Sequence, residues 1–122
     1  MLNVMIVDDC STTREYIKKF LNRLDINRIN EAENGEEALE LYDKYKPDLV
    51  FMDINMPKLG GIETVKILNE KYFHINVIMI TSFDDQNVIF EALSSGAKGF
   101  ITKPLDLFKL KKEINKIVNF IG

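Results

Sequence analysis

The chain has 122 residues, of which 46% are hydrophobic and 29% charged, with a formal net charge of −3. This length predicts one domain, residues 1–122, with a sizeable core. The acidic balance argues against a dedicated nucleic-acid binder, because no excess of lysine and arginine is present to neutralise phosphates. Cys10, the single cysteine, cannot form an internal disulfide, and no apolar run reaches membrane-spanning length. We therefore expect a cytoplasmic protein without membrane insertion.

Short apolar runs predict five β-strands, and each is followed by a helical pattern. The expected strands are Leu2–Val7, Ile26–Ala32, the run 49–52 ending in Asp53, Ile75–Thr81 and Gly99–Thr102. The first, third and fourth runs are almost wholly apolar, which is typical of strands buried on both faces. The second is polar and the fifth is short, as expected of edge strands.

Helix-start signals follow each of these strands. Ser11 or Thr12 is a candidate N-cap for a helix reaching Arg23 or Leu24. Asn34 with Glu37 resembles a capping box for a helix that ends before Pro47. The third helix is expected at 62–72. The fourth is expected from Asp84 and Asp85 to Ser95, with Gly96 as the residue that ends it, and the fifth from Pro104 to Ile121.

Strict alternation of strand and helix predicts an α/β fold, a doubly wound parallel sheet of five strands with five helices. Placing the apolar strands in the centre and the other two at the edges gives the strand order 2-1-3-4-5. In such folds ligands bind at the carboxyl ends of the strands. Polar side chains at these ends are therefore candidates for the functional site.

Four strand ends carry residues of matching chemistry. They are Asp8-Asp9, Asp53, Thr81-Ser82 and Lys103-Pro104. Clustered carboxylates repel one another, so a cation among them is expected, and an oxygen-only ligand set suits Mg²⁺. A hydroxyl and an ammonium beside them complete the groups needed for phosphoryl transfer. Asp53, on the central strand, is the best candidate for the nucleophile.

The order of these motifs along the whole chain resembles the response-regulator receiver family, whose fold is the CheY-like, flavodoxin-like type. Asn55-Met56-Pro57 and Gly60-Gly61 behind Asp53 add to the resemblance. Each motif is weak by itself, and their joint occurrence at the ends of successive elements makes the resemblance specific.

The resemblance implies a role for each matching residue. Asp53 would be the phosphoacceptor. Asp9, Asp53 and the backbone carbonyl of Asn55 would bind Mg²⁺ directly, and Asp8 would bind it through water. Thr81 and Lys103 would contact the phosphoryl oxygens, and Phe100 would be the switch aromatic.

The function implied is a phosphorylation-activated switch rather than a turnover enzyme. A histidine kinase would supply the phosphoryl group, and the surface of the fourth helix, fifth strand and fifth helix would then control a downstream protein. Chemotaxis or motility is the first expectation. A phosphorelay intermediate and a receiver excised from a transcriptional regulator are the alternatives.

Two other classes share parts of this pattern. A haloacid-dehalogenase-type hydrolase also uses a strand-ending aspartate with Mg²⁺, but it needs a second aspartate where this chain has Asn55. A flavodoxin needs a phosphate-binding loop after the first strand, where Asp8-Asp9 would repel phosphate.

The fourth helix contains three consecutive apolar residues, which one helix face cannot bury together. Leu93 and Ala97 favour Phe90 as the core residue of this group. Ile89 is then expected to be partly exposed and to contact a partner. The lysines of the last helix, Lys109, Lys111, Lys112 and Lys116, are expected to form a solvated face.

Overall fold

The computed structural model describes residues 2–82 and 86–121, with side chains up to residue 117. In these residues, five strands alternate with five helices. The strands are β1 (Asn3–Val7), β2 (Arg28–Ala32), β3 (Leu49–Asp53), β4 (Val77–Thr81) and β5 (Gly99–Thr102). The helices are α1 (Ser11–Arg23), α2 (Gly35–Tyr45), α3 (Gly61–Lys71), α4 (Gln86–Ser94) and α5 (Leu107–Ile121).

All strand pairs are parallel, and the order is β2-β1-β3-β4-β5, which confirms the predicted topology. Every residue of β3 and β4 is buried. At the edge, only Ala32 of β2 is buried and Arg28 is exposed. The polarity of the strands therefore predicted their positions, because a central strand of a parallel sheet is covered by helices on both faces.

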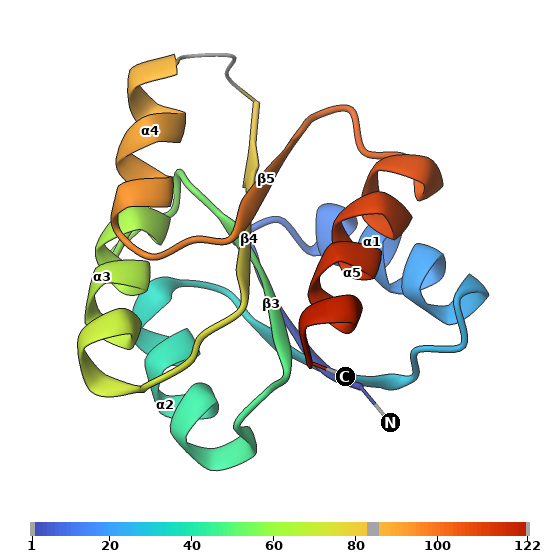
Figure 1. The fold of residues 1–122 in the computed structure, drawn as a ribbon, viewed down its shortest axis with the longest axis horizontal. Helices are drawn as coiled ribbons and strands as arrows, with labels where there is room; N and C mark the ends of the chain where they lie inside the picture. The colour runs from blue at the N-terminus through green and yellow to red at the C-terminus, as the bar shows by residue number, and fades with distance from the viewer. Residues whose placement is uncertain (1, 83–85, 122) are drawn as a thin grey trace.

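The helices form two layers around the sheet (Figure 1). Helices α1 and α5 pack on one face, where Val4 and Ile6 of β1 point. Helices α2, α3 and α4 pack on the other face, against Met5 and Val7. Successive strand residues thus contribute to two separate cores, as the two-residue period of a strand requires.

The second and fourth strands begin later than expected. Asp25 adopts a left-handed backbone with φ of 61°, and the Ile26 amide donates to the Leu21 carbonyl at 2.9 Å. Leu24 and Asp25 therefore form a turn that closes α1, and β2 begins at Arg28 rather than at Ile26. Ile75 is buried but lies outside the ladder, which begins at Val77.

The helix starts differ in how well the sequence predicted them. Asn34 caps α2 as expected, since its Oδ1 accepts from the Glu37 amide at 2.9 Å. Cys10, rather than Ser11 or Thr12, occupies the N-cap position of α1. Pro104 does not begin α5. The helix starts at Leu107, and Asp106 Oδ1 accepts from the Lys109 amide at 2.7 Å.

Gly96, with φ of 126°, follows the end of α4, as expected of a helix-ending glycine. The start expected for that helix, at Asp84 and Asp85, lies outside the described residues. No helix in residues 2–82 or 86–121 has the length and apolar character needed to cross a membrane.

The assignment of the core residue in α4 was wrong. Ile89 is 6% exposed and Phe90 is 73% exposed, so the buried stripe runs through Ile89 and Ala92. The prediction used Leu93 and Ala97 to set the helical phase, but Leu93, within α4, is 40% exposed. Because α4 ends at Ser94, Ala97 lies beyond the helix and its burial carries no information about that phase. Ile89 is therefore a core residue rather than the partly exposed one that was expected.

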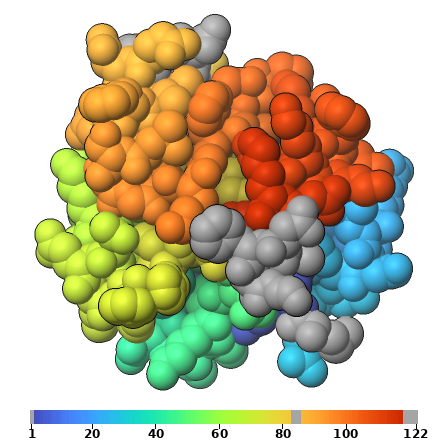
Figure 2. Space-filling model, viewed as in Figure 1, coloured from blue at the N-terminus to red at the C-terminus, as the bar shows by residue number. Residues whose placement is uncertain are grey.

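Figure 2 views the molecule from the side of α4 and α5. A hollow separates the residues leading into β5 from α5, and part of β4 is visible at its base. Residues lining this hollow include Ile78, Lys98 and Glu113. The exposed surface of α4, β5 and α5 is called the α4–β5–α5 face below.

Candidate functional site

The carboxyl ends of β1, β3, β4 and β5 bring the predicted site residues to one edge of the sheet. Backbone hydrogen bonds continue past the strand ends and fix this edge. The Asp8 amide donates to the Ala32 carbonyl at 3.0 Å, and the Lys103 amide donates to the Thr81 carbonyl at 2.8 Å. Beside Asp53, the Ile54 amide donates to the Ile80 carbonyl at 3.1 Å. Strand pairing therefore fixes the backbone position of each functional residue.

Asp8, Asp9 and Asp53 form the acidic cluster. Each offers a carboxylate oxygen, and these three oxygens lie within 4.8 Å of one another. Asp8 is 1% exposed and Asp53 is 7% exposed, whereas Asp9 is exposed. The sequence thus predicted the residues of the cluster, and the structure brings all three together.

Burial sets the electrostatics of the cluster. Loss of hydration raises the pKa of Asp53 from 3.8 to about 6, and the charge of Asp8 adds to this rise while Lys103 opposes it. Burial likewise raises the pKa of Asp8, although the Cys10 amide donates to its Oδ1 at 2.8 Å. Two buried carboxyl groups therefore lie together with too little positive charge to stabilise their ionised forms.

A divalent cation fits this arrangement. Within the described part of the chain, Oδ2 of Asp8 is the one buried side-chain oxygen that lacks a hydrogen-bond partner. Its ion-pair partner, the Lys103 ammonium, is 4.0 Å away, beyond hydrogen-bond distance. A cluster of carboxylate oxygens with an unsatisfied lone pair is typical of a Mg²⁺ site.

The loop between β3 and α3 folds tightly behind Asp53. The Gly61 amide donates to the Ile54 carbonyl at 2.9 Å, and a Cβ at Gly61 would overlap the Asp53 carbonyl oxygen. Glycine is required here because the backbones approach so closely. Lys58, with φ of 67°, forms the tip of the loop. The end of β3 is thereby held in place by the start of α3.

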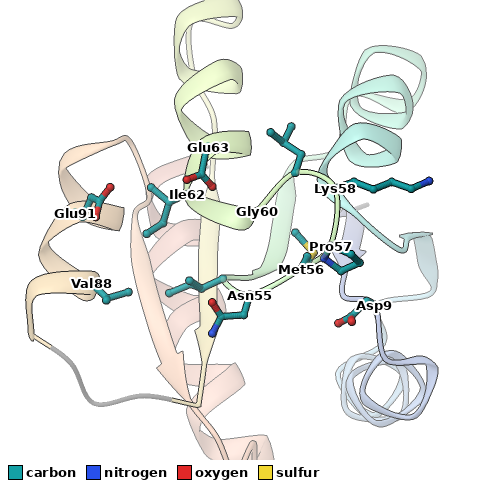
Figure 3. Close-up of a pocket in the computed structure, with 12 residues that line it drawn as sticks. Asp9, Asn55, Met56, Pro57, Lys58, Gly60, Ile62, Glu63, Val88 and Glu91 are labelled. Atoms are coloured by element: carbon teal, nitrogen blue, oxygen red, sulfur yellow. The ribbon is translucent and has the colours of Figure 1, made fainter.

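A pocket of about 920 Å³ adjoins the acidic cluster (Figure 3). Asp9 and Asn55 line its end nearest the cluster, and Val88 and Glu91 of α4 lie on the opposite side. Both Asp9 and Asn55 are exposed. Of the three cluster residues, Asp9 lines this pocket, so the pocket reaches the exposed side of the cluster.

Thr81 and Lys103 complete the site edge. Thr81 is 1% exposed, and the Lys103 side chain is 29% exposed. Phe100 is half-buried and packs against the core on the α2–α3–α4 side of the sheet, at the register position of Met79. It therefore lies on the strand next to Thr81, two register positions away.

Two contributors were missed by sequence reasoning. The Arg14 guanidinium donates to the Asp8 carbonyl at 2.6 Å and pairs with Glu31 at 3.0 Å, so it anchors the end of β1. Lys109 donates to the carbonyls of Thr102, the last residue of β5, and Pro104, which lie on either side of Lys103. Both residues lie on amphipathic helices, where a charged side chain gives no local signal that it bonds to a loop.

Known proteins resemble this chain over nearly its full length. The model of the response regulator receiver domain matches residues 4–115. The chemotaxis protein CheY of Bacillus subtilis is 37% identical over 116 residues, covering 95% of this chain and 97% of that protein. The transcriptional regulatory protein DegU of Brevibacillus brevis is 35% identical over 106 residues, covering 86% of this chain but 45% of DegU.

A solved structure agrees with this result. A chain of the CheX–CheY–BeF3–Mg²⁺ complex from Borrelia burgdorferi matches with a TM-score of 0.92 and 34% identity, covering 96% of this chain and 89% of that chain. Receiver domains interact with histidine kinases and, apart from their own phosphorylation chemistry, are not catalysts. The hydrolase and flavodoxin alternatives are therefore set aside. By its matched residues and its acidic cluster, the chain belongs to the response regulator receiver domain family.

Proposed function

We propose that this chain is a phosphorylation-activated signalling switch in which Asp53 accepts a phosphoryl group from a histidine kinase. The observation that carries the proposal is the acidic cluster, with three carboxylates within 4.8 Å of one another at one sheet edge. The Lys103 ammonium lies 4.0 Å from Asp8 at the same edge. This combination suits in-line phosphoryl transfer to a carboxylate.

In the transfer step, a carboxylate oxygen of Asp53 attacks phosphorus as the bond from phosphorus to the donor breaks. The breaking bond is P–N for a phosphohistidine, and its electron pair stays on the imidazole nitrogen. Asp53 must be ionised to attack, and the raised pKa of about 6 leaves it mostly ionised at neutral pH. Lys103 and Thr81 would contact the phosphoryl oxygens, supplying a positive charge and a hydroxyl donor.

The metal ligands in this proposal are Asp8, Asp9, Asp53 and the backbone carbonyl of Asn55. Bound Mg²⁺ would neutralise charge on the carboxylates and on the phosphoryl oxygens. The unsatisfied Oδ2 of Asp8 and the exposure of Asp9 support this assignment.

Chemotaxis or motility is the pathway that the relatives favour. The CheY of Bacillus subtilis is matched over 97% of its length. The match to 45% of DegU keeps a receiver from a transcriptional regulator as the alternative. A phosphorelay intermediate would have the same site chemistry as a chemotaxis receiver, so these two uses differ only in the partner protein.

The output would be a change in the α4–β5–α5 face that controls a downstream protein. Phe100 would be the switch residue, and it has no hydroxyl group to hold it at the surface by a hydrogen bond. The exposed ring of Phe90 lies on the same face and takes the contact role first expected of Ile89. An aromatic anchor of this kind is typical of protein interfaces.

Intact-mass spectrometry after treatment with acetyl phosphate and Mg²⁺ tests the proposal. The wild-type chain should gain one phosphoryl group, and Asp53→Asn should gain none, because its amide is not a nucleophile of this kind. Asp48→Asn, which changes an aspartate at the other end of β3, serves as the matched control. Labelling of Asp53→Asn at the wild-type level would remove Asp53 from the role.

A further inference from the structure

Lys109 makes two hydrogen bonds that its position on an exposed helix would not suggest. Its ammonium donates to the Thr102 carbonyl at 3.2 Å and to the Pro104 carbonyl at 2.9 Å. These carbonyls lie on either side of Lys103 in the chain. The ammonium of Lys109 therefore holds the backbone immediately before and after Lys103.

The first turn of α5 is itself attached to this loop. Asp106 Oδ1 accepts from the Lys109 amide at 2.7 Å, and the Leu110 amide donates to the Asp106 carbonyl at 3.2 Å. Leu110 is fully buried, which anchors the turn to the core. On the other side of the loop, the Lys103 amide donates to the Thr81 carbonyl. The loop is thus fixed between β4 and α5.

The location of Lys109 argues against a purely solvating role. A cation in the first turn of a helix faces the positive end of the helix dipole, which is unfavourable. Lys109 is half-buried, whereas Lys111 and Lys112 on the same helix are exposed. The two carbonyl acceptors compensate for this unfavourable position.

We propose that Lys109 is a positioning residue that holds Lys103 in place to contact the phosphoryl group. The inference rests on the proposed phosphorylation of Asp53. A lysine ammonium is a point charge on a flexible stem, so its placement depends on where its backbone is held. Fixing the carbonyls on both sides of Lys103 restricts the starting point of that stem. Without Lys109, the Lys103 ammonium would occupy the productive position for a smaller part of the time.

The test compares the initial rate of phosphorylation by acetyl phosphate at saturating Mg²⁺. Lys109→Met keeps the apolar stem and removes the hydrogen-bond donors. We expect it to be labelled about five- to tenfold more slowly than wild type, a smaller effect than the roughly 100-fold cost of a misplaced reacting group. Lys109→Arg restores donors and should recover most of the rate. Lys111→Met, which removes an exposed lysine from the same helix, should label at the wild-type rate.

A double variant separates positioning from general destabilisation. In a Lys103→Met background, adding Lys109→Met should cause no further slowing, because the residue through which it acts is already gone. Mg²⁺ affinity, measured by calorimetry, should be the same in Lys109→Met and wild type. If Lys109→Met does not fold, Lys109→Gln takes its place in the same comparison.

The inference fails if wild type and Lys109→Met label at the same rate. It also fails if Lys109→Met slows labelling equally with and without Lys103. Failure of the proposed function gives a different result, namely a wild-type chain that acetyl phosphate and Mg²⁺ do not label at Asp53.

Discussion

The acidic cluster and the α4–β5–α5 face reverse the usual partition of polar and apolar groups. At the cluster, the charged side chains of Asp8 and Asp53 are buried at the ends of β1 and β3. On the face, the Phe90 ring is 73% exposed and Phe100 is only half-buried. Burying a charge is costly unless it is paired, and an exposed ring loses the free energy that burial would give.

The two regions also differ in what fixes them. Backbone hydrogen bonds between parallel strands hold the residues of the cluster, with Asp8 joined to Ala32 and the residue after Asp53 joined to Ile80. The face is built from two helices and an edge strand, and Phe90 projects from α4 without being buried. The cluster is thus held by the backbone of the sheet, whereas the exposed Phe90 ring of the face is not held by burial.

The largest stability effect should separate Ile89 from Phe90. Ile89→Ala removes a side chain that is 6% exposed and should lower the free energy of unfolding by about 2–4 kcal/mol. Phe90→Ala should change it by about 0.5 kcal/mol or less, because the ring is largely in solvent already. Urea unfolding of both variants measures this difference. Equal losses of unfolding free energy in the two variants would mean that the face is not distinct from the core.

Asp53→Asn should stabilise the metal-free protein at pH 7.5 by about 2–3 kcal/mol. The native pKa of about 6 lies above the unfolded value of 3.8, so the native state holds its proton more tightly. The stability contributed by this protonated group is present below pH 3.8 and is lost as the pH rises through 6. The variant carries no ionisable group there, so its advantage over wild type should shrink at pH 5.

Unfolding at pH 7.5 and pH 5 in the presence of a chelator measures this effect. Addition of Mg²⁺ should reduce the advantage of the variant at pH 7.5, because bound metal stabilises the wild-type cluster. An advantage that is the same at both pH values would contradict the account of a buried, ionised Asp53.

Asp9→Asn should weaken Mg²⁺ binding by about tenfold, which is equivalent to about 1.4 kcal/mol. This free energy is within the range expected for one contact between charges near a protein surface. Phosphorylation should slow in parallel. Because Asp9 is exposed, its replacement should hardly change the fold. Asp25→Asn is the control, since it removes an exposed carboxylate near the opposite end of α1 and asparagine tolerates the φ of 61° there. Wild-type affinity in Asp9→Asn would exclude Asp9 as a ligand.

The sequence predicted most where strand patterns decided the structure. The strand order followed from the apolar character of β3 and β4 and the polar character of β2. The acidic cluster followed from the rule that parallel strands end at one edge, so Asp8, Asp9 and Asp53 were identified together.

The sequence predicted least where long side chains or helix ends decided the structure. Ala97 lies past the end of α4, so its use in setting the helical phase led to the wrong prediction that Ile89 is exposed. Pro104 is a common residue at helix starts, yet Asp106 caps α5 instead. The bonds of Lys109 and Arg14 depend on where loops fold back in space, and local patterns do not contain that information.

The central claim is that the acidic cluster controls the α4–β5–α5 face through Thr81. In this account Thr81 would donate its hydroxyl to a phosphoryl oxygen on Asp53, the end of β4 would move toward the site, and Phe100 would turn inward. The driving hydrogen bond would be charge-assisted and contribute about 1.5–3 kcal/mol, enough to shift a nearly balanced equilibrium between two states. The free protein should therefore already populate the inward state to some extent.

The most direct measurement is the NMR response to beryllofluoride, a mimic of the phosphoryl group, in wild type and Thr81→Ala. In wild type, chemical-shift changes should extend from Asp53 into residues 86–112. In Thr81→Ala, the changes around Asp53 should remain while those in residues 86–112 become much smaller. A full wild-type pattern in Thr81→Ala, with the mimic bound at Asp53, would contradict the coupling.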